Sequence, residues 1–201
     1  MKHLIFDCGQ VLVHFEPAYM VGLYVTDPAD AKLLEEVVFD RLYWDRLDAG
    51  TITDEETMTA VKSRLPEHLW EVADTIYYNW IYNIPEMEGM RALILRAKES
   101  YGADTYLLSN ISHYCADHAS EIPILSLIDR PVYSSKCGLV KPSEAIYRYL
   151  LDTYALDPAE CLFVDDRVDN VAAAEAVGIC GYLFDGNADK LGAYLDEILS
   201  R

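Results

Sequence analysis

The sequence predicts an α/β protein in which helices cover both faces of a parallel sheet and a helical segment is inserted after the first strand. Three observations support this fold class. Short apolar segments alternate with helical patterns over most of the chain. These segments contain few polar residues, which is typical of strands buried on both faces. Residues 15–85 contain no such segment, and their pattern indicates helix almost throughout.

The expected core consists of five strands and the helices that connect them. The strands are His3–Phe6, Thr105–Leu108, Pro131–Ser134, Cys161–Val164 and Gly181–Phe184. The helical patterns are Glu86–Ser100, Pro142–Leu156, Asp169–Val177 and Ala188–Leu199. We therefore assign residues 1–14 and 86–201 to a Rossmann-like core domain of three layers, helix, sheet and helix.

Residues 15–85 are expected to form a separate helical cap domain. Thr53 and Glu56 have the spacing of a capping box, which predicts a helix from this point to about Arg64. Pro66 suits the first turn of a further helix, which is expected to end near Tyr82. All three tryptophans of the chain lie in this segment. Most of these rings are expected to fill the core of the cap, and a few to face a substrate.

Composition limits the classes of partner. The net charge of −18 argues against nucleic acid and anionic membranes. No apolar run approaches the ~18 residues that a membrane-spanning helix needs. The cysteines, five in number and without a CxxC pair, predict a reducing, cytoplasmic location. We expect a small molecule as the partner and either a monomer or a homodimer.

Polar residues follow several of the expected strands directly. Asp7 follows the first strand, Ser109 and Asn110 the second, and Asp165 and Asp166 the fourth. The carboxyl ends of parallel strands meet at one edge of a sheet, where ligands bind. Lys141, just before an expected helix, could reach the same edge. Each residue alone could be a turn residue, a helix cap or a surface charge. Together, however, adjacent acids repel unless a cation is present, which predicts a Mg²⁺ site.

Four motifs in this order resemble the haloacid dehalogenase superfamily, in its phosphatase branch with an inserted helical cap. They are FD-x-G-x-V, LLSN, GLVKP and FVDDRVDN, and the segment WDRLDAGTI is similar to the cap turn of that family. The chain looks closest to the subgroup that acts on sugar phosphates such as glucose 1-phosphate. The resemblance implies a Mg²⁺-dependent phosphomonoester hydrolase that acts on a small phosphorylated metabolite through an aspartyl-phosphate.

The resemblance also implies a role for each motif residue. Asp7 would be the nucleophile, and Lys141 would neutralise both this carboxylate and the transferring phosphoryl group. The phosphoryl oxygens would be bound by Ser109, Asn110 and Lys141. Mg²⁺ would be held by Asp7, the carbonyl of Gly9 and Asp166. Asp165 and Asn170 would orient the water molecules around the metal.

The sequence departs from the commoner family pattern at Gly9, where a second aspartate usually serves as general acid and base. Loss of such a group typically costs about 10²–10⁴-fold in rate. Gln10, His14 and Asp48 are the nearest candidates to replace it, and no pattern singles out one of them. If none of them replaces the missing acid, the chain is expected to be a slow phosphatase that needs good leaving groups, or a non-catalytic module that binds phosphate and Mg²⁺.

Three rival classes are disfavoured by the same motifs. A C–halogen hydrolase of the superfamily needs no metal and usually lacks an acid pair such as Asp165–Asp166. A phosphomutase is disfavoured by the missing acid at position 9. A phospho-acceptor signalling domain places its acid pair near the first strand, whereas here the pair follows the fourth expected strand.

Overall fold

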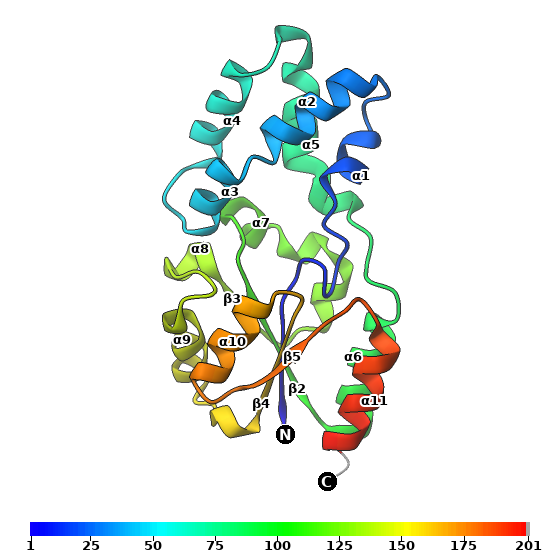
Figure 1. Ribbon diagram of the computed structural model, residues 1–201, viewed down its shortest axis with the longest axis vertical. Coiled ribbons are helices and arrows are strands. Elements are labelled where there is room, and N and C mark those ends of the chain that lie inside the picture. Colours follow the sequence, from blue (N-terminus) through cyan, green and yellow to red (C-terminus); the bar gives the residue numbers. More distant parts are fainter. Residues whose placement is uncertain (200–201) are drawn as a thin grey trace.

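The computed structural model describes residues 1–199, and its centre is a five-stranded parallel sheet of order β3-β2-β1-β4-β5 (Figure 1). The strands are β1 (His3–Phe6), β2 (Asp104–Ser109), β3 (Arg130–Tyr133), β4 (Cys161–Asp165) and β5 (Cys180–Leu183). The chain adds β2 and β3 on one side of β1 and then crosses to β4 and β5 on the other side. The α/β class with a parallel sheet is therefore confirmed.

Helices cover both faces of this sheet (Figure 1). On one face lie α6 (Met90–Tyr101) and α11 (Ala188–Leu199), and on the other lie α9 (Glu144–Tyr154) and α10 (Val168–Ala176). Alternate strand residues supply the two faces, as strand geometry requires. Leu4 and Phe6 belong to the buried cluster that includes Leu191 of α11, whereas Ile5 belongs to the cluster that includes Ile146 of α9.

The segment between β1 and α6 forms the helices α1 to α5, which lie beyond the carboxyl ends of the strands (Figure 1). They are α1 (Pro17–Gly22), α2 (Pro28–Val38), α3 (Arg41–Asp48), α4 (Asp54–Ser63) and α5 (Trp70–Asn83), with a 3₁₀ turn, Glu67–Leu69, before α5. Thr53 caps α4 through the expected capping box with Glu56. The buried cluster of the sheet continues into these helices. A division into core and cap at residues 15 and 85 stays a prediction.

Some boundaries differ from the expected ones. The helix expected from Glu86 begins only at Met90, because Glu86 pairs with Val13 in a β-bridge and Gly89 has a φ of 80°. The strand expected to reach Ser134 ends one residue earlier, where α8 (Ser134–Cys137) begins. Short elements between the motifs were not expected: α7 (His113–Asp117) and the 3₁₀ turns Ala119–Glu121, Pro123–Leu127 and Pro158–Glu160. Their few residues carry no periodicity long enough to predict.

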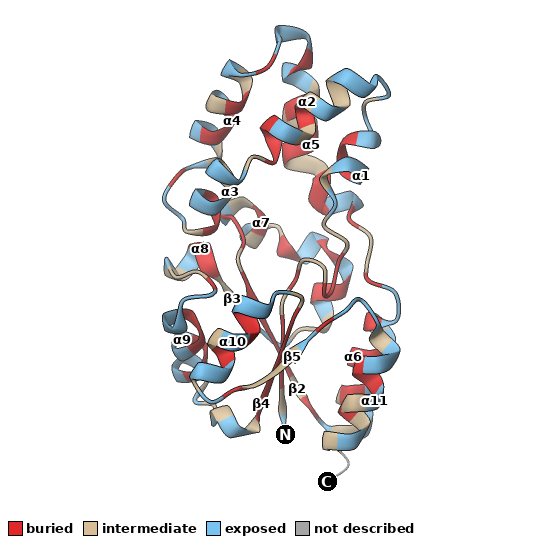
Figure 2. Cartoon of the chain, in the orientation of Figure 1, coloured by how far each residue is buried: buried red, intermediate tan, exposed pale blue. Residues whose placement is uncertain are grey.

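Buried residues are concentrated in the three central strands β1, β2 and β4 and on the helix sides that face the sheet (Figure 2). All five residues of β4 are buried, and the last of them is the carboxylate residue Asp165. A buried carboxylate needs charged or hydrogen-bonding partners, so this strand end points to a polar site. No helix within residues 1–199 combines the length and the apolar character needed to cross a membrane.

Candidate active site

A cavity of about 540 Å³ lies at the carboxyl edge of the sheet, where the strand order reverses at β1. The residue after β1, the end of β2 and the residue after β4 all contribute to its wall, as do the loop before α9 and helices of the inserted segment. Of the predicted site residues, those that line it are Asp7, Gly9, Ser109, Asn110, Lys141, Asp166 and Asn170. Asp165 lies behind this wall, fully buried.

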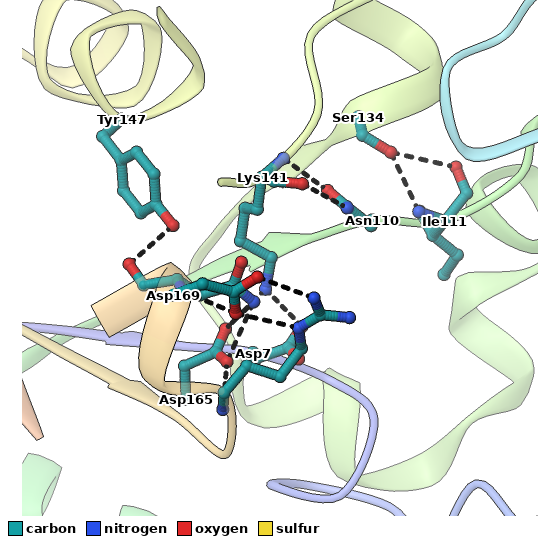
Figure 3. A network of polar contacts seen from close by, with 10 residues as sticks. Asp7, Asn110, Ile111, Ser134, Lys141, Tyr147, Asp165 and Asp169 are labelled. Carbon is teal, nitrogen blue, oxygen red and sulfur yellow. Dashed lines mark hydrogen bonds and ion pairs between the residues drawn. The ribbon is translucent and has the colours of Figure 1, made fainter. Parts of the chain in front are cut away.

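Lys141 joins two of the predicted carboxylates (Figure 3). Its Nζ lies 2.8 Å from Asp7 Oδ1 and 2.8 Å from Asp165 Oδ2. Burial acts to lower the pKa of Lys141, but the two carboxylates outweigh burial and raise this pKa above its ordinary value. The ammonium group therefore stays charged beside Asp7, which is the compensation that an anionic nucleophile needs in an acidic protein.

Both oxygens of the Asp165 carboxylate accept hydrogen bonds from other groups of the protein. The donors are Lys141 Nζ at 2.8 Å, Asn170 Nδ2 at 3.0 Å and the backbone N–H of Arg167 at 2.9 Å. Tyr147 in turn donates from its hydroxyl to the Asn170 carbonyl at 2.8 Å (Figure 3). Asp165 and Asn170 thus hold Lys141 and the start of α10 in place. Their expected role toward metal-bound water stays a prediction.

The donor set fits a hard divalent cation. One carboxylate oxygen from each of Asp7, Asp165 and Asp166 lies within 4.8 Å of the others. Because the hydrogen bonds described above occupy Asp165, Asp7 and Asp166 are the carboxylates that remain for a cation. Burial raises the pKa of Asp7 to about 6, and it also raises the pKa of Asp166. A bound cation would favour the ionised form of both groups, and oxygen donors of this kind suit Mg²⁺.

The predicted phosphate-binding residues lie next to this acidic group. Ser109, at the end of β2, is 3% exposed and lines the cavity. The Asn110 side chain is bonded to the backbone of Lys141 in both directions: its Nδ2 donates to the Lys141 carbonyl at 3.0 Å, and its Oδ1 accepts from the Lys141 N–H at 2.8 Å. Asn110 therefore fixes the loop that carries Lys141, and its amide is not free to bind a ligand.

The inserted segment supplies a further part of the cavity wall, and most of these residues were not predicted. Phe15, Trp44 and Trp80 form an aromatic cluster in which the centroid of the Phe15 ring lies 5.2 Å from each tryptophan. Arg41 and Asp45, an ion pair one turn apart on α3, also line the cavity. No sequence signal separates such residues from the other aromatic and charged residues of the segment, because only the orientation of a side chain decides whether it lines the cavity.

The three candidates for the missing acid differ clearly. Gln10 donates from its side-chain amide to the Phe15 carbonyl at 3.0 Å and completes the turn after β1. His14 is not among the residues that line the cavity. Asp48, at the end of α3, lines the cavity and is 6% exposed. Its burial raises the pKa of this carboxyl to about 7.

A family model of haloacid dehalogenase-like hydrolases matches residues 1–178. The chain belongs to this family. The superfamily resemblance inferred from the four motifs is therefore confirmed, and the protein is an enzyme of the hydrolase class. The finer resemblance to the subgroup that acts on glucose 1-phosphate is not confirmed.

Two relatives of this haloacid dehalogenase-like hydrolase are named phosphatases. It is 25% identical over 181 residues to the sesquiterpene phosphatase astK of Aspergillus oryzae, an alignment that spans 90% of this chain and 88% of the relative. It is 24% identical over 199 residues to the D-ribitol-5-phosphate phosphatase of Bacteroides thetaiotaomicron, spanning 94% of each chain. These names support phosphatase chemistry but disagree about the substrate.

A solved structure shares the fold of the hydrolase over nearly its whole length. It is a haloacid dehalogenase family enzyme of Bacteroides thetaiotaomicron in complex with magnesium and inorganic phosphate. The two chains superpose with a TM-score of 0.69 at 17% identity, over 93% of this chain and 96% of the other. At this identity the likeness establishes the fold.

Proposed function

We propose that this protein is a Mg²⁺-dependent phosphomonoester hydrolase that acts on a small phosphorylated metabolite through an aspartyl-phosphate on Asp7. The observation that carries the proposal is the placement of the Lys141 ammonium between Asp7 and Asp165, beside Asp166 and at the edge of a cavity. Phosphoryl transfer depends mainly on positioning and charge neutralisation. This arrangement offers both.

The residues divide the work as follows. An oxygen of Asp7 attacks phosphorus, and Lys141 stabilises the negative charge that collects between the two groups. The Ser109 hydroxyl and the backbone N–H of Asn110 bind phosphoryl oxygens. Asp7, the Gly9 carbonyl and Asp166 would hold Mg²⁺, which would neutralise phosphate charge when bound.

The non-catalytic alternative raised by Gly9 is not favoured, because the family is one of hydrolases and its named relatives include phosphatases. A cytoplasmic location remains part of the proposal, since the five cysteines within residues 1–199 are all free. So does the absence of nucleic acid and membrane partners, given the net charge of −18. The state in solution is proposed to be a monomer or a homodimer.

Metal removal tests the proposal. Phosphate release from 4-nitrophenyl phosphate is expected to fall at least about a hundredfold in EDTA and to return when Mg²⁺ is added. Mg²⁺ is also expected to raise the unfolding temperature of the wild-type protein but not that of Asp166→Asn, because binding stabilises only a protein that has the site. Asp152→Asn, an exposed acid on α9, is the matched control and should keep both responses. Full activity in EDTA would contradict the metal assignment.

The substrate is expected to present an apolar face to the cap. Phe15, Trp44 and Trp80 form an aromatic wall. Trp44 uses its Nε1 in a hydrogen bond to the Val38 carbonyl at 2.8 Å and stacks its ring on Phe39, so the polar atom is satisfied and the ring surface at the cavity is apolar. This wall favours a terpenyl or aryl phosphate over a polyol or sugar phosphate. The two named relatives span both of these classes.

A substrate panel with one cap variant tests this preference. A terpenyl phosphate is expected to give a kcat/KM at least about tenfold above that of D-ribitol 5-phosphate, which corresponds to about 1.4 kcal/mol of apolar burial. Trp44→Leu should raise KM for the terpenyl phosphate more than for 4-nitrophenyl phosphate. Trp70→Leu, which alters a tryptophan that is 40% exposed and outside the cavity wall, is the control. A preference for the polyol phosphate would overturn the apolar assignment.

A further inference from the structure

On the cap side of the cavity lies the Asp48 carboxyl group, which makes no hydrogen bond or ion pair with any of residues 1–199. We propose that Asp48 is the general acid that protonates the leaving oxygen of the substrate, and the general base that then activates water. The proposal rests on the proposed phosphatase function. It gives the protein a proton donor that Gly9 does not supply.

The position of Asp48 follows from the geometry of phosphoryl transfer. The attacking and leaving oxygens lie roughly in line on opposite sides of phosphorus. Asp7 attacks from the sheet, so the leaving oxygen faces the helices of the inserted segment, and Asp48 lies in the cavity wall formed by those helices. The other carboxylates that line the cavity are committed: Asp166 to the proposed metal site, and Asp45 to an ion pair with Arg41.

The turn that carries Asp48 is fastened to the core. Ser134 at the start of α8 donates from its hydroxyl to the Asp48 carbonyl at 2.6 Å and accepts from the Ile111 N–H at 2.9 Å (Figure 3 shows the Ser134–Ile111 pair). Gly50, with a φ of 67°, approaches the core so closely that an added Cβ would lie 2.8 Å from the Ser135 carbonyl oxygen. The backbone of Asp48 is therefore held at the cavity by direct contacts with the core.

The side chain of Asp48, by contrast, has no fixed partner in the part of the chain that the structure describes. Within residues 1–199 no hydrogen bond or ion pair engages the Asp48 carboxylate. A carboxyl that is 6% exposed and unpaired costs free energy when ionised, and this cost is typical of a group kept for function. The hydrogen bond from Ser134 engages only the backbone carbonyl of Asp48 and leaves its carboxylate unbonded.

Burial and the charges around Asp48 raise the pKa of its carboxyl group, so that the group is partly protonated near neutral pH. Burial favours the neutral form most strongly, and the carboxylates of Asp45 and Asp7 act in the same direction. Arg41 and Lys141 oppose them and favour the ionised form. The net result is a pKa of about 7, which allows the same group to give and to take a proton.

The two steps balance as follows. In the first, Asp7 Oδ forms a bond to phosphorus, the bond between phosphorus and the ester oxygen breaks, and that oxygen takes the proton of Asp48 to leave as an alcohol. In the second, water attacks the phosphorus of the aspartyl-phosphate and gives one proton to the Asp48 carboxylate. The bond between phosphorus and Asp7 breaks, which releases inorganic phosphate and restores both residues.

A leaving-group series tests the assignment in the full-length protein. Asp48→Asn is expected to slow hydrolysis of an alkyl phosphate by about 10²–10⁴-fold and that of 4-nitrophenyl phosphate by less than about tenfold, because a nitrophenolate needs little protonation to leave. The rate should therefore depend weakly on leaving-group pKa in the wild-type protein and steeply in the variant. The alkaline limb of the wild-type pH profile should also disappear. Glu55→Gln, an exposed acid on α4, is the control and should match the wild type.

A second substitution adds an independent readout. Gly9→Asp restores the usual acid, and the backbone accepts it because an added Cβ meets only the Phe15 Cβ at 3.8 Å. Combined with Asp48→Asn, it is expected to recover at least about tenfold of the lost alkyl phosphate activity, which also shows that the double variant is folded.

The outcomes separate the two proposals. An equal loss on all leaving groups in Asp48→Asn, or no recovery by Gly9→Asp, would overturn the role of Asp48 alone. Absence of Mg²⁺-dependent hydrolysis of 4-nitrophenyl phosphate by the wild-type protein would overturn the proposed function, and the role of Asp48 with it.

Discussion

Asp7→Asn is expected to lower the rate of phosphate release at least about 10⁴-fold, because the amide cannot form the aspartyl-phosphate. Acid-quenched wild-type protein should carry a covalent phosphoryl group, detectable by mass spectrometry after incubation with substrate. The variant should carry none. Loss of the nucleophile is expected to have a larger effect on activity than loss of any other residue of the site.

The same variant should remain stably folded. Burial raises the pKa of Asp7 to about 6, so at pH 7.5 the folded metal-free protein holds an ionised carboxylate whose burial lowers the free energy of unfolding. The neutral amide removes this cost, and Lys141 keeps Asp165 as its ion-pair partner. Thermal unfolding without metal should therefore occur at or above the wild-type temperature. Activity equal to that of the wild type would defeat the assignment of Asp7 as nucleophile.

The fold could be predicted from the sequence because short local patterns indicate most of its strands and helices. The residues Cys161–Val164 form an uninterrupted apolar run, and only a strand covered on both faces buries such a run completely. The capping box at Thr53 fixes the start of α4 for an equally local reason. By contrast, the start of α6 depends on a bridge between Glu86 and Val13, distant in sequence, and no local pattern reveals this contact.

The core part of the site was predictable for a topological reason. Parallel strands end at one edge, so the residues that follow β1, β2 and β4 meet whatever their separation along the chain. The detailed partners were not predictable. The carboxylate oxygens of Asp165 accept hydrogen bonds from Lys141, Asn170 and the Arg167 N–H. These bonds depend on the orientation of the side chains. The burial of Asp48 likewise depends on how α3 docks on α8, which a single sequence does not encode in any short pattern.

Lys141→Met is expected to lower both the activity and the stability of the protein. The substitution leaves Asp7, whose side chain is 13% exposed, and the fully buried Asp165 without the ammonium that lies 2.8 Å from each. Loss of a charge that stabilises the transferring group typically costs about 10²–10³-fold in rate. Removal of one partner from a buried ion pair typically costs about 3–5 kcal/mol of stability. Phosphate release and urea unfolding of wild type and variant without metal measure the two effects.

The pH dependence separates lost charge from lost packing. The pKa of Lys141 is raised above 10.5, so its stabilising effect is fully present below that pH and disappears only above it. Asp7, with a pKa of about 6, is mostly neutral at pH 5.5 and mostly ionised at pH 8. The stability difference between variant and wild type should therefore be larger at pH 8 than at pH 5.5.

A surface lysine provides the matched control for this experiment. Lys136→Met removes an ammonium from α8 whose side chain is 41% exposed and paired with Asp117 at the surface. Such a pair contributes about 0–1 kcal/mol, so both activity and stability should stay close to the wild type at either pH. An equal loss of stability for Lys141→Met at pH 5.5 and pH 8 would show that Lys141 contributes to stability only through the packing of its methylene chain. It would remove the case for an ammonium held in place to balance the charge of the nucleophile.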